Sequence, residues 1–111
     1  MLRELLRTFL ESKGYRVVTA VDGEEALDTY RRRQKEIAVV VSDLGLPKFG
    51  GDELCRRLAR LTPGIRLIIA SGYVDPAVRE RMTQEGVREY VHKPYNPNEL
   101  LSAIHTVLRG Q

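Results

Sequence analysis

Polar residues suited to phosphate chemistry follow three short apolar runs of the sequence. They are Asp43 after residues 37–41, Ser71 with Gly72 after residues 65–70, and Lys93 after residues 90–92. A carboxylate beside a buried strand is costly unless it meets a cation, a metal or hydrogen-bond donors. Taken singly, Asp43 and Ser71 are also ordinary turn residues. Together, an acid, a hydroxyl and an ammonium at successive strand ends favour one site for an anion or a phosphate.

The apolar pattern predicts helices and strands in alternation. Residues 2–10 carry apolar side chains at helical spacing, and Gly14 supplies a left-handed stop. Strands are predicted at residues 15–21, 37–41, 65–70 and 90–92, with further helices beginning after Asp22, after the loop 45–51, after Asp75 and after Asn96. This order predicts an α/β fold in which helices cover both faces of a parallel sheet. In such sheets the site lies beyond the carboxyl ends of the strands.

Composition narrows the class of protein. The sequence has 111 residues, of which 42% are hydrophobic, and one cysteine, so we expect a single domain over residues 1–111 in a reducing cytoplasm. Its apolar runs are far shorter than the roughly 20 residues that cross a membrane. The net charge of +3 is too small to indicate direct binding of nucleic acid. The basic run 31–35 is interpreted as a solvated helix end, with a docking patch for an acidic partner as the alternative.

Three motifs resemble the response-regulator receiver family of two-component signalling. Residues 39–51 resemble the phosphoacceptor strand and loop of that family, with Pro47 four residues after Asp43. Residues 68–72 resemble the strand that ends in its Ser/Thr switch residue, and residues 89–95 resemble its element of an aromatic residue, a lysine and a proline. The resemblance extends over essentially the whole chain. It implies a flavodoxin-like, receiver-type sheet and a signalling module that is not an enzyme.

The resemblance also implies roles for individual residues. Asp43 would accept a phosphoryl group from the phosphohistidine of a histidine kinase or a phosphotransfer protein. Lys93, Ser71 and Gly72 would bind the phosphoryl group. Ser71 and Tyr90 would act as the switch, and Tyr90 would report the change on the surface around the last strand and helix, where a downstream protein partner binds.

The family binds Mg²⁺, and the resemblance implies an incomplete metal site here. Family members begin with a strand that ends in an acidic pair, and the pair helps to hold the metal. The present sequence starts inside the first predicted helix, which leaves Asp43 and the Gly45 carbonyl as metal ligands. The same resemblance implies a cis peptide bond before Pro94. The alternative function is a phosphorylation-independent, receiver-like interaction module that binds its partner through the surface at Tyr90.

Loss of the first strand has a structural consequence, because that strand lies at the centre of the family's sheet. We expect one of two outcomes. Either the sheet is rearranged, with residues 15–21 pairing directly with residues 37–41 to give a four-stranded sheet, or another chain completes it in a strand-exchanged homodimer.

Overall fold

Five α-helices and three strands alternate along the part of the chain that the structure describes. The structure is a computed structural model, and it describes residues 2–43, 51–72 and 75–110. The elements are α1 (Leu2–Ser12), α2 (Gly23–Arg33), the short 3-10 helix η1 (Gln34–Glu36), β1 (Val40–Asp43), α3 (Gly51–Leu61), β2 (Leu67–Ser71), α4 (Pro76–Gln84), β3 (Val87–His92) and α5 (Pro97–Gly110). None of the described helices is both long enough and apolar enough to cross a membrane.

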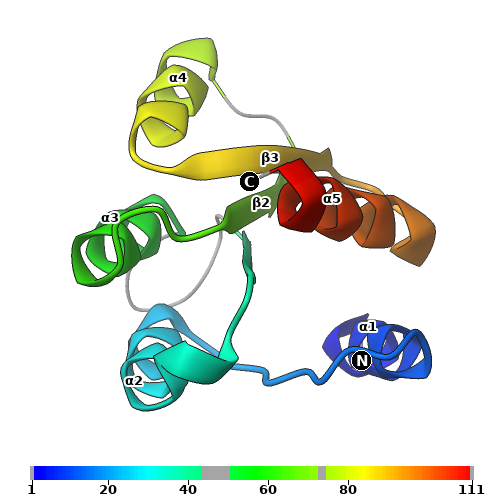
Figure 1. Cartoon of the computed structure of the whole chain (residues 1–111). Helices are drawn as coiled ribbons and strands as arrows, with labels where there is room; N and C mark the ends of the chain where they lie inside the picture. The colour runs from blue at the N-terminus through cyan, green and yellow to red at the C-terminus, as the bar shows by residue number, and fades with distance from the viewer. Residues whose placement is uncertain (1, 44–50, 73–74, 111) are drawn as a thin grey trace.

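The strands form one parallel sheet in the order β1-β2-β3. Helices α2, α3 and α4 lie on one face of the sheet, and α1 and α5 lie on the other (Figure 1). The predicted α/β fold with a helix-covered parallel sheet is therefore confirmed. The strands begin at Val40, Leu67 and Val87 rather than at residues 37, 65 and 90. The ladder between β1 and β2 begins where the Val40 N–H donates to the Arg66 carbonyl at 3.0 Å.

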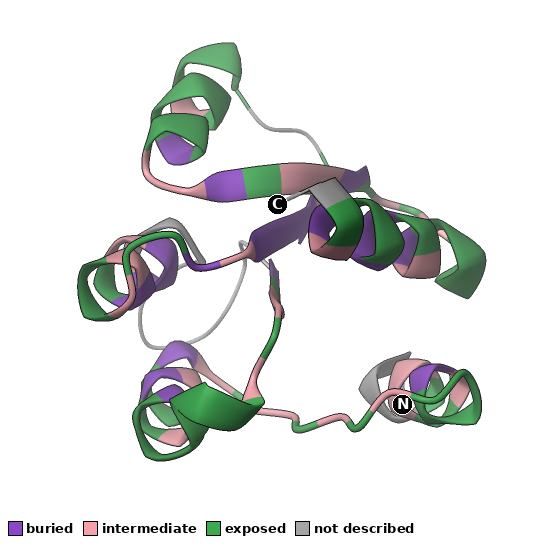
Figure 2. Cartoon of the chain, viewed as in Figure 1, coloured by how far each residue is buried: buried purple, intermediate pink, exposed green. Residues whose placement is uncertain are grey.

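The central strand is buried on both faces (Figure 2). Leu67 and Ile69 lie in the apolar cluster beneath α2, α3 and α4, whereas Ile68 and Ala70 lie in the cluster with α1 and α5. Leu67, Ile68 and Ile69 each have 0% of their surface exposed. Burial on both faces explains why this stretch of the sequence is apolar without alternation.

The prediction of a strand over residues 15–21 is wrong. Gly14, with φ +97°, does end the first helix as predicted, because glycine adopts this left-handed conformation without strain. The chain then runs as an extended segment whose side chains alternate between partly buried and exposed at residues 15–19. In the described part of the chain, this segment makes no ladder with β1.

The predicted four-stranded closure is therefore wrong as well, because a strand needs a partner at hydrogen-bond distance and residues 15–21 contact the helical layers instead. Tyr15 and Val17 pack against the cluster beneath α5, and the Tyr15 ring lies 6.2 Å from the ring of His105 on that helix. On the other face, the Tyr30 hydroxyl of α2 donates to Thr62 Oγ1 at 2.9 Å, at the end of α3. The segment thus packs against the α5 layer at its start, and the helix that follows it packs against α3.

Candidate functional site at the carboxyl ends of the strands

The carboxyl ends of β1, β2 and β3 lie side by side. Asp43 ends β1 and pairs in register with Ala70, and Ser71 ends β2 in register with His92. The backbone N–H of Lys93 donates to the Ser71 carbonyl at 2.7 Å. Neighbouring strands in a sheet are about 4.7–4.9 Å apart, so the backbones of Asp43, Ser71 and Lys93 are brought to one edge, about 10 Å from end to end.

The structure describes the side chains of Ser71 and Lys93 at this edge but not that of Asp43. Ser71 and Lys93 are half-buried, and Gly72 is exposed. The peptide bond between Lys93 and Pro94 is cis. The side chain of Asp43 and the loop 44–50, which includes Gly45, lie outside the described residues.

The described residues do not provide a magnesium site. Among the residues whose side chains the structure describes, which do not include Asp43 and Asp52, no three His, Cys, Asp or Glu residues lie in an arrangement that could hold a metal ion. Glu53, the first acid after the loop whose side chain is described, is already engaged by the guanidinium groups of Arg57 and Arg56. Hydrogen bonds from these two arginines hold the pKa of Glu53 below its usual value. Mg²⁺ requires near-octahedral oxygen coordination, so these residues do not fit it.

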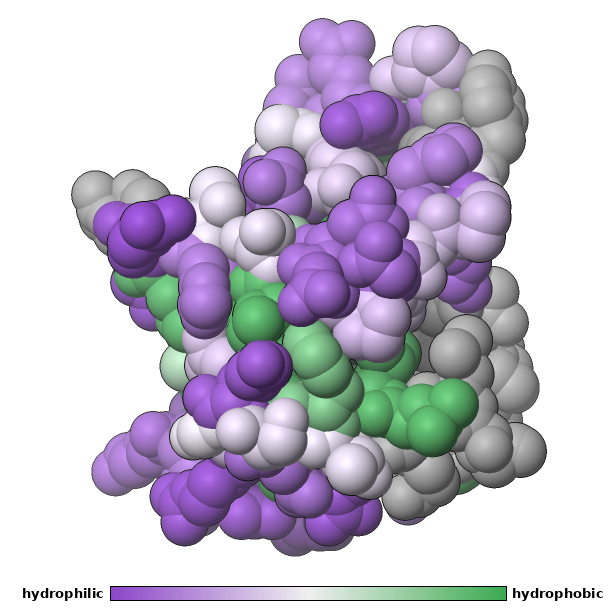
Figure 3. Space-filling model, turned by 90° about the vertical axis from the view of Figure 1, so that its right-hand side faces the viewer, coloured by the Kyte–Doolittle hydropathy of each residue, from purple (hydrophilic) through white to green (hydrophobic). Residues whose placement is uncertain are grey.

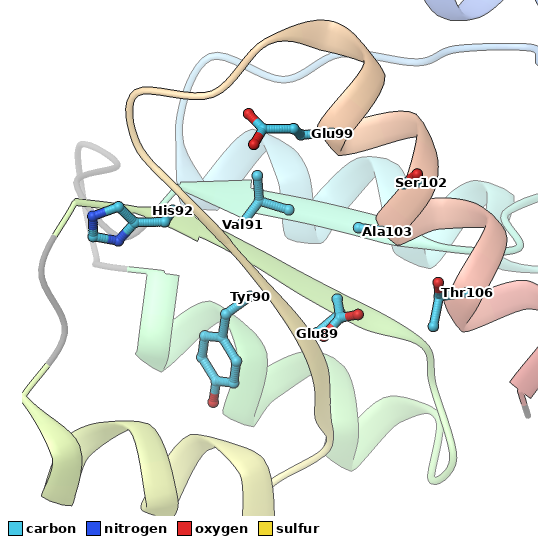
Figure 4. Close-up of a pocket in the computed structure, with 8 residues that line it drawn as sticks. All are labelled: Glu89, Tyr90, Val91, His92, Glu99, Ser102, Ala103 and Thr106. Carbon is cyan, nitrogen blue, oxygen red and sulfur yellow. The ribbon is translucent and has the colours of Figure 1, made fainter.

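Tyr90, the aromatic residue of the expected switch, is held against α4. Its hydroxyl donates to the Arg79 carbonyl at 2.9 Å and lies 3.0 Å from Thr83 Oγ1. The Arg79 guanidinium carbon lies 4.3 Å from the centre of the ring. In Figure 4 the ring points toward α4, away from the side of β3 on which Glu99 lies.

The two partners of Tyr90 on α4 were not found from the sequence. Arg79 and Thr83 are four residues apart, so they lie on one face of the helix, and the Thr83 hydroxyl donates to the Arg79 carbonyl at 2.9 Å. The spacing of four residues in the sequence indicates that Arg79 and Thr83 share a face of the helix. Only the packing of α4 beside β3 shows that this face contacts Tyr90.

We predict that the paired substitution Arg79→Gln and Thr83→Val loosens the Tyr90 ring, although the hydrogen bond from its hydroxyl to the backbone carbonyl of residue 79 is retained. The Arg79→Gln change removes the cation–π contact, which contributes about 0.5–1 kcal/mol at an exposed site, so the released population should rise by about two- to fivefold. Ring resonances of ¹³C-labelled tyrosine would measure the change. Thr83→Ser keeps the hydroxyl and should leave the Tyr90 signal as in the wild type. Unchanged Tyr90 resonances in the double variant would contradict the prediction.

An open pocket of about 260 Å³ lies between β3 and α5, on the surface expected to bind a partner. Its lining is mostly polar, and Figure 4 shows the residues that form it: Glu89, Tyr90, Val91, His92, Glu99, Ser102, Ala103 and Thr106. The pocket is separate from Ser71 and Lys93. The described structure thus has a strand-end site and, on the flank of β3, a surface that includes the switch residue.

Known proteins resemble this chain over nearly its full length. A probable transcriptional regulator of Porphyridium aerugineum, ycf27, is 36% identical over 108 residues, which are 97% of this chain and 44% of that protein. The sensor kinase CckA of Brucella abortus is 31% identical over 92% of this chain and 11% of its own length. The chain thus spans less than half the length of these relatives.

The fold of this chain is also similar to that of solved receiver structures. A CheY-like receiver domain protein from Methanospirillum hungatei superposes with a TM-score of 0.88 and 28% identity, over 98% of this chain and 86% of that chain. The model of the response regulator receiver domain matches residues 1–105. Because this match covers nearly the whole chain, the protein belongs to the response regulator receiver domain family, a class of non-enzymatic signalling modules of two-component systems.

Proposed function

We propose that this chain is the phosphoacceptor receiver of a two-component phosphorelay in the cytoplasm, and that Asp43 accepts the phosphoryl group from a histidine kinase or a phosphotransfer protein. The observation that carries the proposal is the meeting of the three strand ends, with Lys93 joined to Ser71 by a backbone hydrogen bond of 2.7 Å. Membership of the receiver family and the similarity to a sensor kinase support it.

The proposed reaction needs one nucleophile and groups that stabilise negative charge. A carboxylate oxygen of Asp43 would attack phosphorus, forming a P–O bond as the P–N bond to the donor imidazole breaks, and the imidazole would take up a proton. The ammonium of Lys93 would pair with a phosphoryl oxygen, and the hydroxyl of Ser71 would donate a hydrogen bond to another. The exposed Gly72 would leave room beside Ser71 for the phosphoryl group. No step is assigned to Mg²⁺, because no three of the acidic, histidine or cysteine side chains that the structure describes lie together where they could hold it.

Phosphorylation would act on a partner through Tyr90. When Ser71 moves toward the phosphoryl group, the proposed switch would release Tyr90 from Arg79 and Thr83, and the surface of β3 and α5 would change. The phosphoryl group at the strand ends can shift the equilibrium between the held and the released Tyr90 ring only if it interacts more favourably with one of these two states. The downstream partner would therefore be a protein that distinguishes the two positions of the Tyr90 ring.

The direct test is incubation of the chain with acetyl phosphate, followed by intact-mass spectrometry. We expect a gain of one phosphoryl group, which hydroxylamine removes because the product is an acyl phosphate. Magnesium should be included in one arm and chelated in the other. A chain that gains no phosphoryl group in either arm, yet still binds a partner through the Tyr90 surface, would replace the proposal with the phosphorylation-independent module.

A further inference from the structure

A second face of the molecule lies at the amino ends of the strands, opposite the strand-end site. Each helix returns the chain from the carboxyl end of one strand toward the amino end of the next, so the last turns of the helices lie at this face. Val40, Leu67 and Val87, the first residues of the three strands, are paired in register. Because β2 has five residues and rises about 3.3 Å per residue, this face lies about 15 Å from Ser71.

Hydrogen bonds join the segments that form this face. Thr62 Oγ1, just after α3, donates to Gln34 Oε1, just after α2, at 3.3 Å. Arg88 Nη2 on β3 donates to the Gly64 carbonyl at 3.0 Å. Figure 1 shows α2 and α3 next to each other on the same side of the sheet. We call the surface formed by residues 33–36, 60–66 and 88 the amino-end face.

The amino-end face is strongly basic. It has a single acid, Glu36, against five cations: Arg33, Lys35, Arg60, Arg66 and Arg88. These residues give it a net charge of +4, larger than the +3 of the whole chain, so the remaining residues together carry −1. Arg33 Nη2 donates to Glu36 Oε1 at 2.8 Å, and this hydrogen bond holds the pKa of Glu36 below its usual value. Lys35 and Arg60 are exposed and form no ion pair within the described part of the chain, so the positive charge is largely uncompensated.

Helix electrostatics explain only part of this charge. Cations in the last turn of a helix offset the negative end of its macrodipole, which accounts for Arg33 and Arg60. Arg66 and Arg88, however, lie outside the helices. The register between β2 and β3 shifts at the start of the strands, so Arg88 is left out of the pairing and its side chain reaches the turn after α3 instead. The Arg66 Nε is buried and, among the described residues, has no hydrogen-bond partner. Two guanidinium groups without a carboxylate partner favour an anionic ligand here.

The other side chains of the face indicate which kind of anion binds. Leu61, which follows Arg60 directly, is 39% exposed, and Pro63 is exposed as well. Guanidinium groups bind carboxylates through paired hydrogen bonds, and an apolar side chain of the same ligand would cover Leu61. Single-stranded nucleic acid stacks its bases on aromatic side chains, and the amino-end face has none. The backbone of a duplex offers phosphates but no apolar side chain.

A membrane is a poor match for the same surface. Binding in the plane of a bilayer requires a broad apolar face beside the cations. Figure 3 shows a band of apolar surface between hydrophilic regions on the side of α1 and α5. The amino-end face, in contrast, exposes one leucine and one proline among its cations. A polypeptide that carries both carboxylates and an apolar residue therefore fits best.

We propose that the amino-end face is a docking site for an acidic segment of a partner protein, in which an apolar residue lies among aspartates or glutamates. The carboxylates pair with the guanidinium groups of Arg60, Arg66 and Arg88, and the apolar residue contacts Leu61. This interaction goes beyond the proposed phosphoacceptor function, because the face is separate from the strand-end site and from the surface at Tyr90.

Fluorescence anisotropy of a labelled peptide tests the proposal on the full, unphosphorylated chain. The probe is a synthetic peptide with a central leucine flanked by glutamates. We expect saturable binding that weakens as salt is added, because salt screens exposed charges. Arg60→Glu should weaken binding by about fivefold or more, since it removes one attraction and adds a repulsion. Arg7→Glu makes the same change in net charge on α1, in an exposed pair with Glu11, and should leave the affinity within about twofold.

Two further measurements use the wild-type chain and so hold even where Arg60→Glu impairs folding. Amide resonances of residues 60–66 and 88 should shift when the peptide is added, whereas those of Ser71 and Lys93 should not. A peptide with serine in place of the leucine should bind about threefold or more weakly, because it loses the apolar contact with Leu61.

Three results would overturn the proposal. Equal weakening by Arg60→Glu and Arg7→Glu, or shifts confined to other residues, would show unspecific attraction by the total charge. Tighter binding of a DNA duplex of random sequence, with the same loss in Arg60→Glu, would identify nucleic acid as the ligand. Tighter binding of phosphatidylserine vesicles would identify a membrane. Because no phosphoryl donor is present, none of these results bears on the proposed role of Asp43.

Discussion

Replacing Asp43 with asparagine is expected to reduce phosphoryl incorporation from acetyl phosphate to the level seen without the donor. Asparagine has nearly the same shape as aspartate but lacks the carboxylate oxygen that would form the acyl phosphate. Since Asp43 ends β1 in register with Ala70, the backbone at the strand ends should be unaffected. Intact-mass spectrometry, with far-ultraviolet circular dichroism as a check of folding, measures the result.

The matched control is Asp28→Asn. Asp28 is an exposed carboxylate on α2 whose Oδ2 lies 2.6 Å from Arg32 Nη1, away from the strand ends. This variant should incorporate phosphoryl groups as the wild type does. If the Asp43→Asn variant still gains one phosphoryl group, another residue is the acceptor and the proposed role of Asp43 is wrong.

The largest expected effect on stability follows from Ile68→Ala on β2. The Ile68 side chain is 0% exposed and packs with the cluster beneath α1 and α5. Removing such a side chain leaves a cavity and lowers the free energy of unfolding by about 2–5 kcal/mol. Net stabilities of domains are about 5–15 kcal/mol, so this one change could remove much of the stability of the chain.

Urea unfolding followed by circular dichroism would measure this loss. Ile68→Val deletes only one methyl group and should cost about 0.5–1.5 kcal/mol. Leu5→Ala should stay within about 0.5 kcal/mol, because Leu5 is 66% exposed. A free energy of unfolding for Ile68→Ala equal to that of Leu5→Ala would contradict burial of β2 on both faces.

Local patterns in the sequence predicted most of the fold. The stripe of apolar residues on the first helix, the stop at Gly14 and the continuous apolar run of the central strand each reflect interactions within a few residues or burial on both faces. The resulting order of elements was sufficient to bring Asp43, Ser71 and Lys93 to neighbouring strand ends. Their chemical roles remain predictions.

Pairing between distant segments could not be predicted in the same way. Residues 15–21 have the β-branched composition of a strand, but a strand also needs a partner at hydrogen-bond distance. In the described structure Tyr15 contacts α5, Tyr30 of the following helix contacts Thr62, and the segment forms no ladder with β1. The hold of Arg79 and Thr83 on Tyr90 was missed for the same reason, since it depends on how α4 packs beside β3.

The different burial of β2 and β3 decides where a spectroscopic reporter can be attached. On β2, every side chain from Leu67 to Ala70 is buried, so a dye or spin label there would disrupt the packing. On β3, the side chains of Arg88 and His92 are exposed on the strand that also carries Tyr90. A label at His92 would also line the pocket beside α5 (Figure 4). Changes at the strand ends can therefore be followed optically from β3 without a probe in the core.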